Sequence, residues 1–114
     1  NANRAEHRIG IARMLGCDAA DVSAGGLDKA QQMPELKPGY QVEYARVVKK
    51  ETGLVTFAVG LIKEPLQAEA ILAAGDADGI CVGREMLRNP NWGWTAAQAL
   101  HAMVAFPPPY LRAF

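Results

Sequence analysis

The sequence predicts an α/β fold, the C-terminal part of a parallel (β/α)8 barrel, and three observations lead to this prediction. Three short apolar runs, at 20–23, 55–59 and 79–82, are each followed by a helical pattern, the order of parallel strands joined by crossover helices. These runs are apolar for most of their length instead of alternating, as expected of strands covered on both faces. The chain has 114 residues, about half of what a complete barrel needs.

The predicted helices lie before, between and after the strands, so that residues 1–106 contain about three βα units. Each helical pattern carries apolar residues on one face, and a glycine or a run of prolines stands where the pattern ends. Pro65 is placed to begin its helix, since proline suits the first turn. The expected helices are 4–15, 41–50, 65–74 and 92–103.

Two segments lie outside these elements. The connection from 24 to 39 contains three glycines and two prolines and is too irregular for a further helix or strand. A long loop after a barrel strand usually lines the active site, and we expect the same here. At the C-terminus, three consecutive prolines, Pro107 to Pro109, favour an extended backbone. We therefore predict a second unit, an extended arm at 107–114 that projects from the barrel portion.

The composition argues for an ordinary soluble globular protein. Half of the residues are hydrophobic and 21% are charged. Twelve basic residues balance twelve acidic ones without forming a basic stripe, which argues against a nucleic-acid or membrane partner. The sequence shows neither a membrane-spanning run nor a secretory signal, so the expected location is cytoplasmic. Cys17 and Cys81 lack the spacing of a metal or redox pair and are predicted to be buried free thiols.

Two glycines at equivalent strand ends predict an anion site. Gly60 follows the second strand, and Gly83 with Arg84 follows the third. A glycine there lets an anion approach backbone N–H groups, a following helix adds its positive end, and arginine supplies a fork of donors. Barrels often bind phosphate after their last two strands. The alternative is that the glycines only make turns, with Arg84 on the surface paired to Glu85 or Asp76.

The remaining candidates are less specific. Ser23 ends the first strand with a hydroxyl beside small residues, which would let a flat ligand lie close to the backbone; a tight turn explains the same pattern. Asp21 is the acid inside a strand, and we expect it to accept hydrogen bonds from a loop. His7 and His101 have no partners at the spacing of a triad or metal site. Both are predicted to be surface residues.

Several motifs in order along the chain resemble one family. DVSAGGL, PGYQVEYA, VGLI, EAILAAGDADGICVGREMLRNPNW and PPPYLRAF together resemble the Old Yellow Enzyme family of flavin-dependent oxidoreductases. The similarity is greatest to its ene-reductase subgroup related to bacterial xenobiotic reductases. It extends from about Ile11 to the C-terminus and concerns only the C-terminal portion of such an enzyme.

The resemblance implies a complete TIM barrel that holds FMN, is reduced by NADPH or NADH, and transfers hydride to the C=C bond of an α,β-unsaturated carbonyl compound. It implies that Gly60, Gly83 and Arg84 hold the FMN phosphate and that Ser23 lies near the cofactor. It also implies a homo-oligomer in which Tyr110 and Arg112 reach the substrate site of the adjacent subunit. The tail ends Ala-Phe here instead of Gly-Trp.

The family's catalytic residues have no counterpart in this chain. The resemblance places the substrate-binding pair, His-His or His-Asn, and the proton-donating tyrosine in the early strands of the barrel. We therefore assign no catalytic residue, expect the missing N-terminal part of the barrel as partner, and expect no activity from this chain alone. The alternative from another class is a stand-alone phosphate-binding or assembly module without redox activity.

Overall fold

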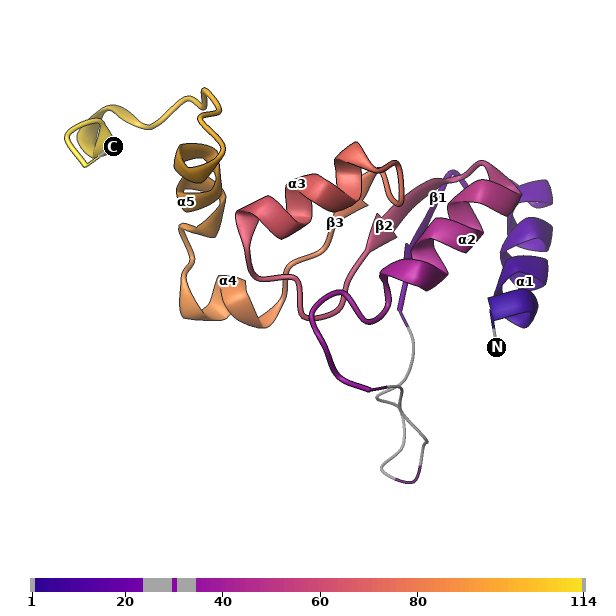
Figure 1. The fold of residues 1–114 in the computed structure, drawn as a ribbon. Helices are drawn as coiled ribbons and strands as arrows, with labels where there is room; N and C mark the ends of the chain where they lie inside the picture. Colours follow the sequence, from indigo (N-terminus) through magenta and orange to yellow (C-terminus); the bar gives the residue numbers. More distant parts are fainter. Residues whose placement is uncertain (1, 24–29, 31–34, 114) are drawn as a thin grey trace.

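The computed structural model describes residues 2–23, 30 and 35–113, with side chains from Arg8 onward. Helices and strands alternate through most of the chain, and the two ends of the chain lie at opposite ends of the molecule (Figure 1). Most of the predicted loop at 24–39 lies outside the described residues. In chain order, the elements are α1 (Ala2–Met14), β1 (Ala19–Val22), α2 (Val42–Thr52), β2 (Val55–Ala58), α3 (Pro65–Ala73), β3 (Gly79–Ile80), α4 (Arg84–Arg88), α5 (Trp92–Ala99) and the 3-10 helix Pro108–Tyr110.

The three strands form one parallel sheet in the order β1-β2-β3. Val22 pairs with Ala58, and Ala58 pairs with Ile80, so the carboxyl ends of the strands lie at the same edge. The predicted strands are confirmed as parallel, although β3 is only two residues long. Parallel neighbours need crossover connections, and α2 and α3 supply them. The chain is therefore a mixed α/β fragment with a small parallel sheet.

The boundaries of α2 and α3 follow from proline and glycine. Pro65 is the first residue of α3, where a missing N–H group is harmless. Gly53 ends α2 in the left-handed conformation, with φ of 66°, and its N–H group donates to the carbonyl oxygen of Lys49. Both helices lie within two residues of their predicted bounds.

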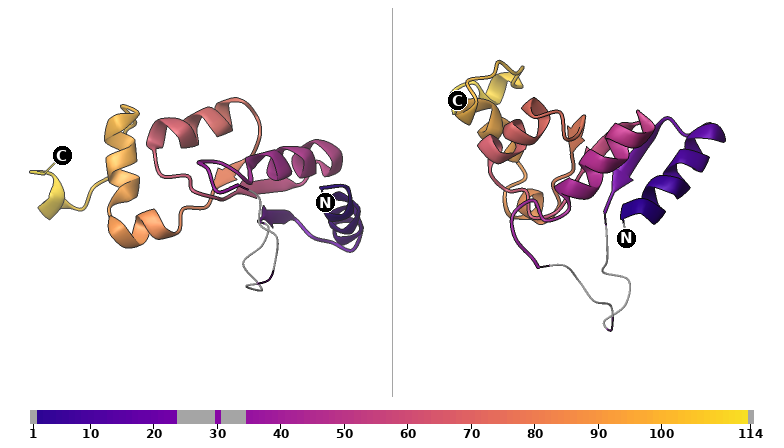
Figure 2. Two further views of the ribbon diagram at one scale, coloured as in Figure 1. Left: turned by 60° about the horizontal axis from the view of Figure 1, so that its bottom comes forward. Right: turned by 45° about the vertical axis from the view of Figure 1, so that its right-hand side comes forward.

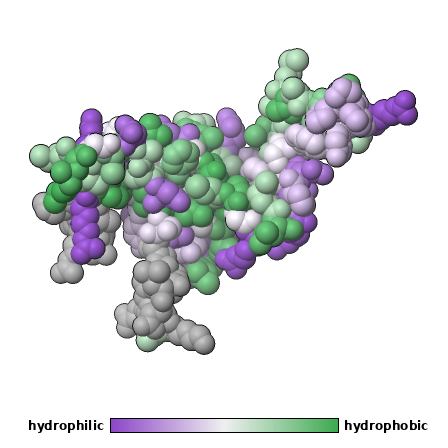
Figure 3. Space-filling model, turned by 180° about the vertical axis from the view of Figure 1, so that it is seen from behind, coloured by the Kyte–Doolittle hydropathy of each residue, from purple (hydrophilic) through white to green (hydrophobic). Residues whose placement is uncertain are grey.

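The core lies between the sheet and the helices on one of its faces. It contains small and branched side chains from the sheet, the helices and the connections between them: Val22, Ala45, Val48, Ala58, Ile62, Ala68, Ile71 and Ala77. The alternate residues of the strands point the other way, where Val55 is 48% exposed and Asp21 is exposed. Within this chain α2 and α3 cover one face only, so the expected covering of the second face by a larger barrel stays a prediction. Figure 3, which views the molecule from behind, shows many apolar residues across its middle.

The helices extend the molecule on either side of this core. The helix α1 packs against α2 at one end, and α3 packs against α5 toward the other (Figure 2). The short helix α4 was not predicted. The last helix ends at Ala99 rather than at 103, because His101 turns left-handed with φ of 53° and the N–H group of Ala102 donates to Ala97.

The segment predicted as an extended arm is extended only at its start. Pro107 has the φ of −57° and ψ of 141° of an extended backbone, but Pro108–Tyr110 forms a 3-10 turn. The Tyr110 ring centroid lies 5.1 Å from that of Trp94 in α5, and Phe106 lies 5.3 Å from the same ring. The tail thus turns back onto its own chain through aromatic contacts. The sequence predicts instead that it projects away from the barrel portion.

The cysteine and histidine side chains differ in how exposed they are. Cys17 is exposed and Cys81 is half-buried; both are free thiols, as predicted, but neither is fully buried. His101 is exposed, as predicted, whereas the side chain of His7 lies outside the described residues. No helix in the described part of the chain is long and apolar enough to cross a membrane.

Candidate functional site

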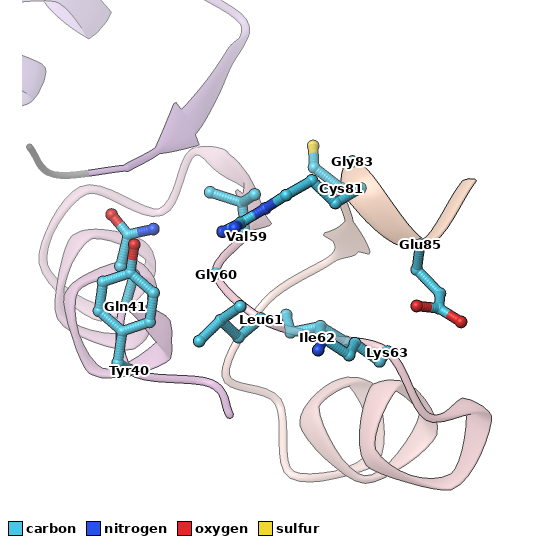
Figure 4. A pocket seen from close by; sticks show the side chains of 11 residues that line it. Tyr40, Gln41, Val59, Gly60, Leu61, Ile62, Lys63, Cys81, Gly83 and Glu85 are labelled. Atoms are coloured by element: carbon cyan, nitrogen blue, oxygen red, sulfur yellow. The ribbon is translucent and has the colours of Figure 1, made fainter. Parts of the chain in front are cut away.

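A pocket of about 150 Å³ opens at the edge where β2 and β3 end. In Figure 4, Tyr40 and Gln41 form one side of it, Cys81, Gly83 and Glu85 stand on the other, and the turn after β2 runs between them. The lining combines backbone groups with polar and charged side chains: Tyr40, Gln41, Val59, Gly60, Leu61, Ile62, Lys63, Cys81, Gly83, Arg84 and Glu85. Pockets in open α/β sheets usually lie at this end of the strands.

The turn after β2 has an unusual backbone conformation. Gly60 has φ of 121° and Leu61 has φ of 52°, two successive residues in the region that disfavours side chains. A Cβ atom at Gly60 would lie 2.9 Å from Nε2 of Gln41 and 3.1 Å from Cε1 of Tyr40. Glycine is therefore required both by the backbone and by the lack of space. Such conformations gather at ligand sites.

Backbone N–H groups are available on both sides of the pocket. Among the described residues, those of Gly60, Leu61, Gly83 and Arg84 donate to no other backbone carbonyl. Unpaired N–H groups grouped in this way suit an anion. The helix α4 has only five residues, so its dipole is small. The expectation of an anion site therefore rests on the backbone N–H groups.

Arg84 brings a permanent positive charge to the pocket. The alternative pairing with Glu85 or Asp76 is not found: Glu85 pairs with Arg88, and Arg84 makes no ion pair within the described part of the chain. Its guanidinium group is therefore available to an anionic ligand, to which it can present two parallel N–H donors.

Two further residues affect the charge of the pocket. Lys63 adds a second positive side chain at the rim of the pocket. Its loop is joined to α5, because Nε1 of Trp92 donates a hydrogen bond to the backbone carbonyl oxygen of Lys63 at 2.7 Å. Burial raises the pKa of the Cys81 thiol, and the charge of Asp21 raises it further. Cys81 is therefore a neutral thiol near pH 7, and it does not oppose an anion.

The pocket unites three of the four predicted cofactor-binding residues: Gly60, Gly83 and Arg84 line it together. Ser23 follows β1 at the same sheet edge, is exposed, and does not line the pocket. Tyr110 and Arg112 are exposed residues of the tail and do not line it either. The described residues contain no group of acidic, cysteine and histidine side chains that could hold a metal ion.

Sequence reasoning missed Tyr40 and Gln41. They precede α2 and come into the pocket because Gly39 turns left-handed, with φ of 73°, before them. A signal was present in the sequence: a glycine followed by two residues with polar groups, immediately before an amphipathic helix. Their position beside Gly60 depends on a contact between loops that are far apart in the sequence.

Curated proteins with similar sequences give the chain its family. No protein-family profile matches it. The NADPH dehydrogenase of Geobacillus thermodenitrificans is 43% identical over 97 residues, which cover 85% of this chain and 28% of the relative. That of Bacillus pumilus is 44% identical over 109 residues, covering 93% of this chain and 32% of the relative. The chain is homologous to NADPH dehydrogenases of the Old Yellow Enzyme family.

The NADPH dehydrogenase of Clostridium acetobutylicum gives a similar result, with 43% identity over 97 residues. The chain spans about 28% to 32% of the length of these curated relatives and corresponds to their C-terminal portion. The family resemblance identified from the motifs is thus confirmed. The match to the Old Yellow Enzyme family covers nearly the whole chain, including the Bacillus licheniformis relative at 42% identity over 93% of it.

Proposed function

We propose that this chain is the phosphate-binding C-terminal part of an FMN-dependent, NAD(P)H-consuming oxidoreductase with a (β/α)8 barrel. The observation that supports this most strongly is that Gly60, Gly83 and Arg84 line one pocket at the carboxyl ends of neighbouring parallel strands. The names of the homologues, NADPH dehydrogenases, supply the class of reaction.

The chemistry of the pocket fits a phosphate ester. Because Gly60 has no side chain, an anion can approach the peptide groups of this turn closely. The available N–H groups and Arg84 would hold the phosphate oxygens, and Lys63 would add charge at the rim. Bound FMN would supply a redox centre that takes hydride from a reduced nicotinamide and passes it to the C=C bond of an enone.

The substrate-binding and proton-donating groups of this reaction lie, in our proposal, in the part of the barrel outside this chain. The uncovered sheet face and the open edges of β1 and β3 support such a partner, because both would be covered by further barrel strands. Within the full-length protein, the role of the described residues is to bind and orient the cofactor.

Replacing Arg84 with alanine tests the proposal. Arg84→Ala in the full-length polypeptide should weaken FMN binding by about 1.5–3 kcal/mol, the range for hydrogen bonds to charged groups. Titration of the apoprotein, followed by the quenching of flavin fluorescence, measures this. Arg46→Ala is the matched control, since Arg46 is an exposed arginine of α2 outside the pocket. Equal FMN affinity in the wild type and Arg84→Ala would refute the assignment.

A further inference from the structure

A short segment before α2 contacts the strained turn of the pocket from the side opposite Gly83 (Figure 4). This segment, Gly39 to Gln41, is called the strap below. The Gly39 N–H group donates to the carbonyl oxygen of Gly60 at 2.9 Å. Tyr40 and Gln41 follow directly and line the pocket beside Gly60. The strap is therefore tied to the turn by the backbone and also packs against it through side chains.

Gln41 is the most buried polar residue of the strap. Only 4% of it is exposed, although glutamine is usually a surface residue. It stands at the N-cap of α2, yet its side chain makes no capping hydrogen bond to that helix. The side chain lies against Gly60 instead, with Nε2 of Gln41 2.9 Å from the place a Cβ would occupy.

The turn needs such support. Gly60 and Leu61 both have positive φ values, and a strained backbone persists only where its surroundings hold it. If the turn relaxed, the N–H groups of Gly60 and Leu61 would no longer be held toward the pocket, and the anion would lose donors that must already be in place when it binds.

We propose that Gln41 is a positioning residue of the anion site, which holds the Gly60–Leu61 turn in the conformation that binds phosphate. This assignment rests on the proposed function of the pocket as a phosphate site. Gln41 acts through the turn, and its amide is neutral, so it supports the donors without adding charge. Arg84, which also lines the pocket, supplies the charge.

The test uses the apoprotein of the full-length polypeptide, labelled with 15N and titrated with inorganic phosphate, following the amide signals of Gly60 and Leu61. The wild type should show saturable shifts. Gln41→Met keeps the length of the side chain but removes the amide that lies against Gly60, and it should weaken phosphate binding about three- to tenfold. Gln41→Glu keeps the shape and adds a negative charge near the anion, so it should weaken binding more than Gln41→Met.

The control is Gln98→Met, because Gln98 is an exposed glutamine of α5 outside the pocket; its phosphate affinity should equal that of the wild type. Circular dichroism identifies any variant that fails to fold, and the isosteric Gln41→Glu then remains as the test. If Arg84→Ala weakens binding while both Gln41 variants bind as the wild type does, the role of Gln41 is wrong and the phosphate site stands. If the wild type shows no saturable shift, the proposed function fails, and the role of Gln41 fails with it.

Discussion

Gly60 shows how a single position can be limited to one residue. Gly60→Ala would place a methyl group within 3.1 Å of both Gln41 and Tyr40 and would force alanine to adopt φ of 121°. We expect a loss of about 1–3 kcal/mol in the free energy of unfolding, the range for a residue held in a disfavoured conformation. Urea unfolding followed by circular dichroism measures it.

Gly83→Ala is the matched control for this prediction. No atom lies within 4 Å of a Cβ atom built at Gly83. Its stability should remain close to that of the wild type, even though both glycines line the same pocket. Equal losses in the two variants would contradict the claim that Gly60 is limited by space and backbone conformation.

Single residues also show how much of the site could be predicted from the sequence. Gly60, Gly83 and Arg84 were identifiable because equivalent strand ends of a parallel sheet meet at one edge, a rule that needs no coordinates. Gln41 was not identifiable in this way, because its contact with Gly60 joins two loops whose approach depends on the whole fold. The exposure of Cys17 was missed for a similar reason, since burial depends on which neighbours cover a residue.

Among the elements, the start of β2 depends on a carboxylate from the turn before β3. Oδ2 of Asp78 accepts a hydrogen bond from the Thr56 N–H group at 2.9 Å, and Oδ1 lies 3.1 Å from Nζ of Lys49 in α2. The Thr56 hydrogen bond, followed by Lys49, lowers the pKa of Asp78 below its ordinary value of 3.8. One side chain thus joins the sheet to its covering helix.

The stability that Asp78 contributes should depend on pH. A carboxyl group with a lowered pKa in the folded state stabilises the fold above its ordinary pKa and loses that effect as the pH falls through the folded value. Asp78→Asn should therefore lower the free energy of unfolding at pH 7, and the difference from wild type should shrink below about pH 4. Denaturation curves collected across this range measure the difference.

Asp76→Asn is the control for the pH dependence. Asp76 lies in the same turn, and its side chain has no hydrogen bond or ion pair within the described residues. Its stability should follow the wild type at every pH. A difference between Asp78→Asn and wild type that stays constant from pH 7 to pH 2 would contradict the role of the charge.

Helices could be predicted from the sequence where residues within the helix or next to it determine where it begins and ends. Pro65 and Gly53 mark helix ends through their own backbone preferences, and α2 and α3 were placed accordingly. The five-residue α4 was not predicted, because it is too short to show the spacing of apolar residues that marks a helix. The early end of α5 at Ala99 depends on His101 adopting a left-handed conformation, which its residue type does not favour strongly.

At the scale of the whole molecule, the tail is the segment whose surroundings would change most in a larger assembly. Tyr110 contacts Trp94 of its own chain, and Arg112 is exposed without an ion pair in the described part of the chain. In the homo-oligomer that the family resemblance implies, this would place a charged side chain beyond the aromatic contact. Arg112 could then reach toward the substrate site of a neighbouring subunit.

Deleting residues 110–114 from the full-length polypeptide tests this arrangement. We expect a higher KM for the enone substrate and a weaker dimer, because the deletion removes both the Arg112 donor and the Tyr110 ring that holds the tail against Trp94. Steady-state kinetics and sedimentation measure the two effects. Tyr110→Phe is the control for packing, since it keeps the ring against Trp94. If the shortened protein matches the intact one in both measurements, the tail does not act on a neighbour.

The uncovered face of the sheet also has a consequence for how the chain behaves in concentrated solution. An open edge and an apolar face that accept strands from the same polypeptide can equally accept strands from other copies, which is how aggregates begin. Asp21 stands on that face in β1, at the edge of the sheet. A second copy that stacked on this face would have to strip water from the Asp21 carboxylate, which has a high energetic cost. We therefore expect Asp21 to disfavour the stacking of two copies through this face.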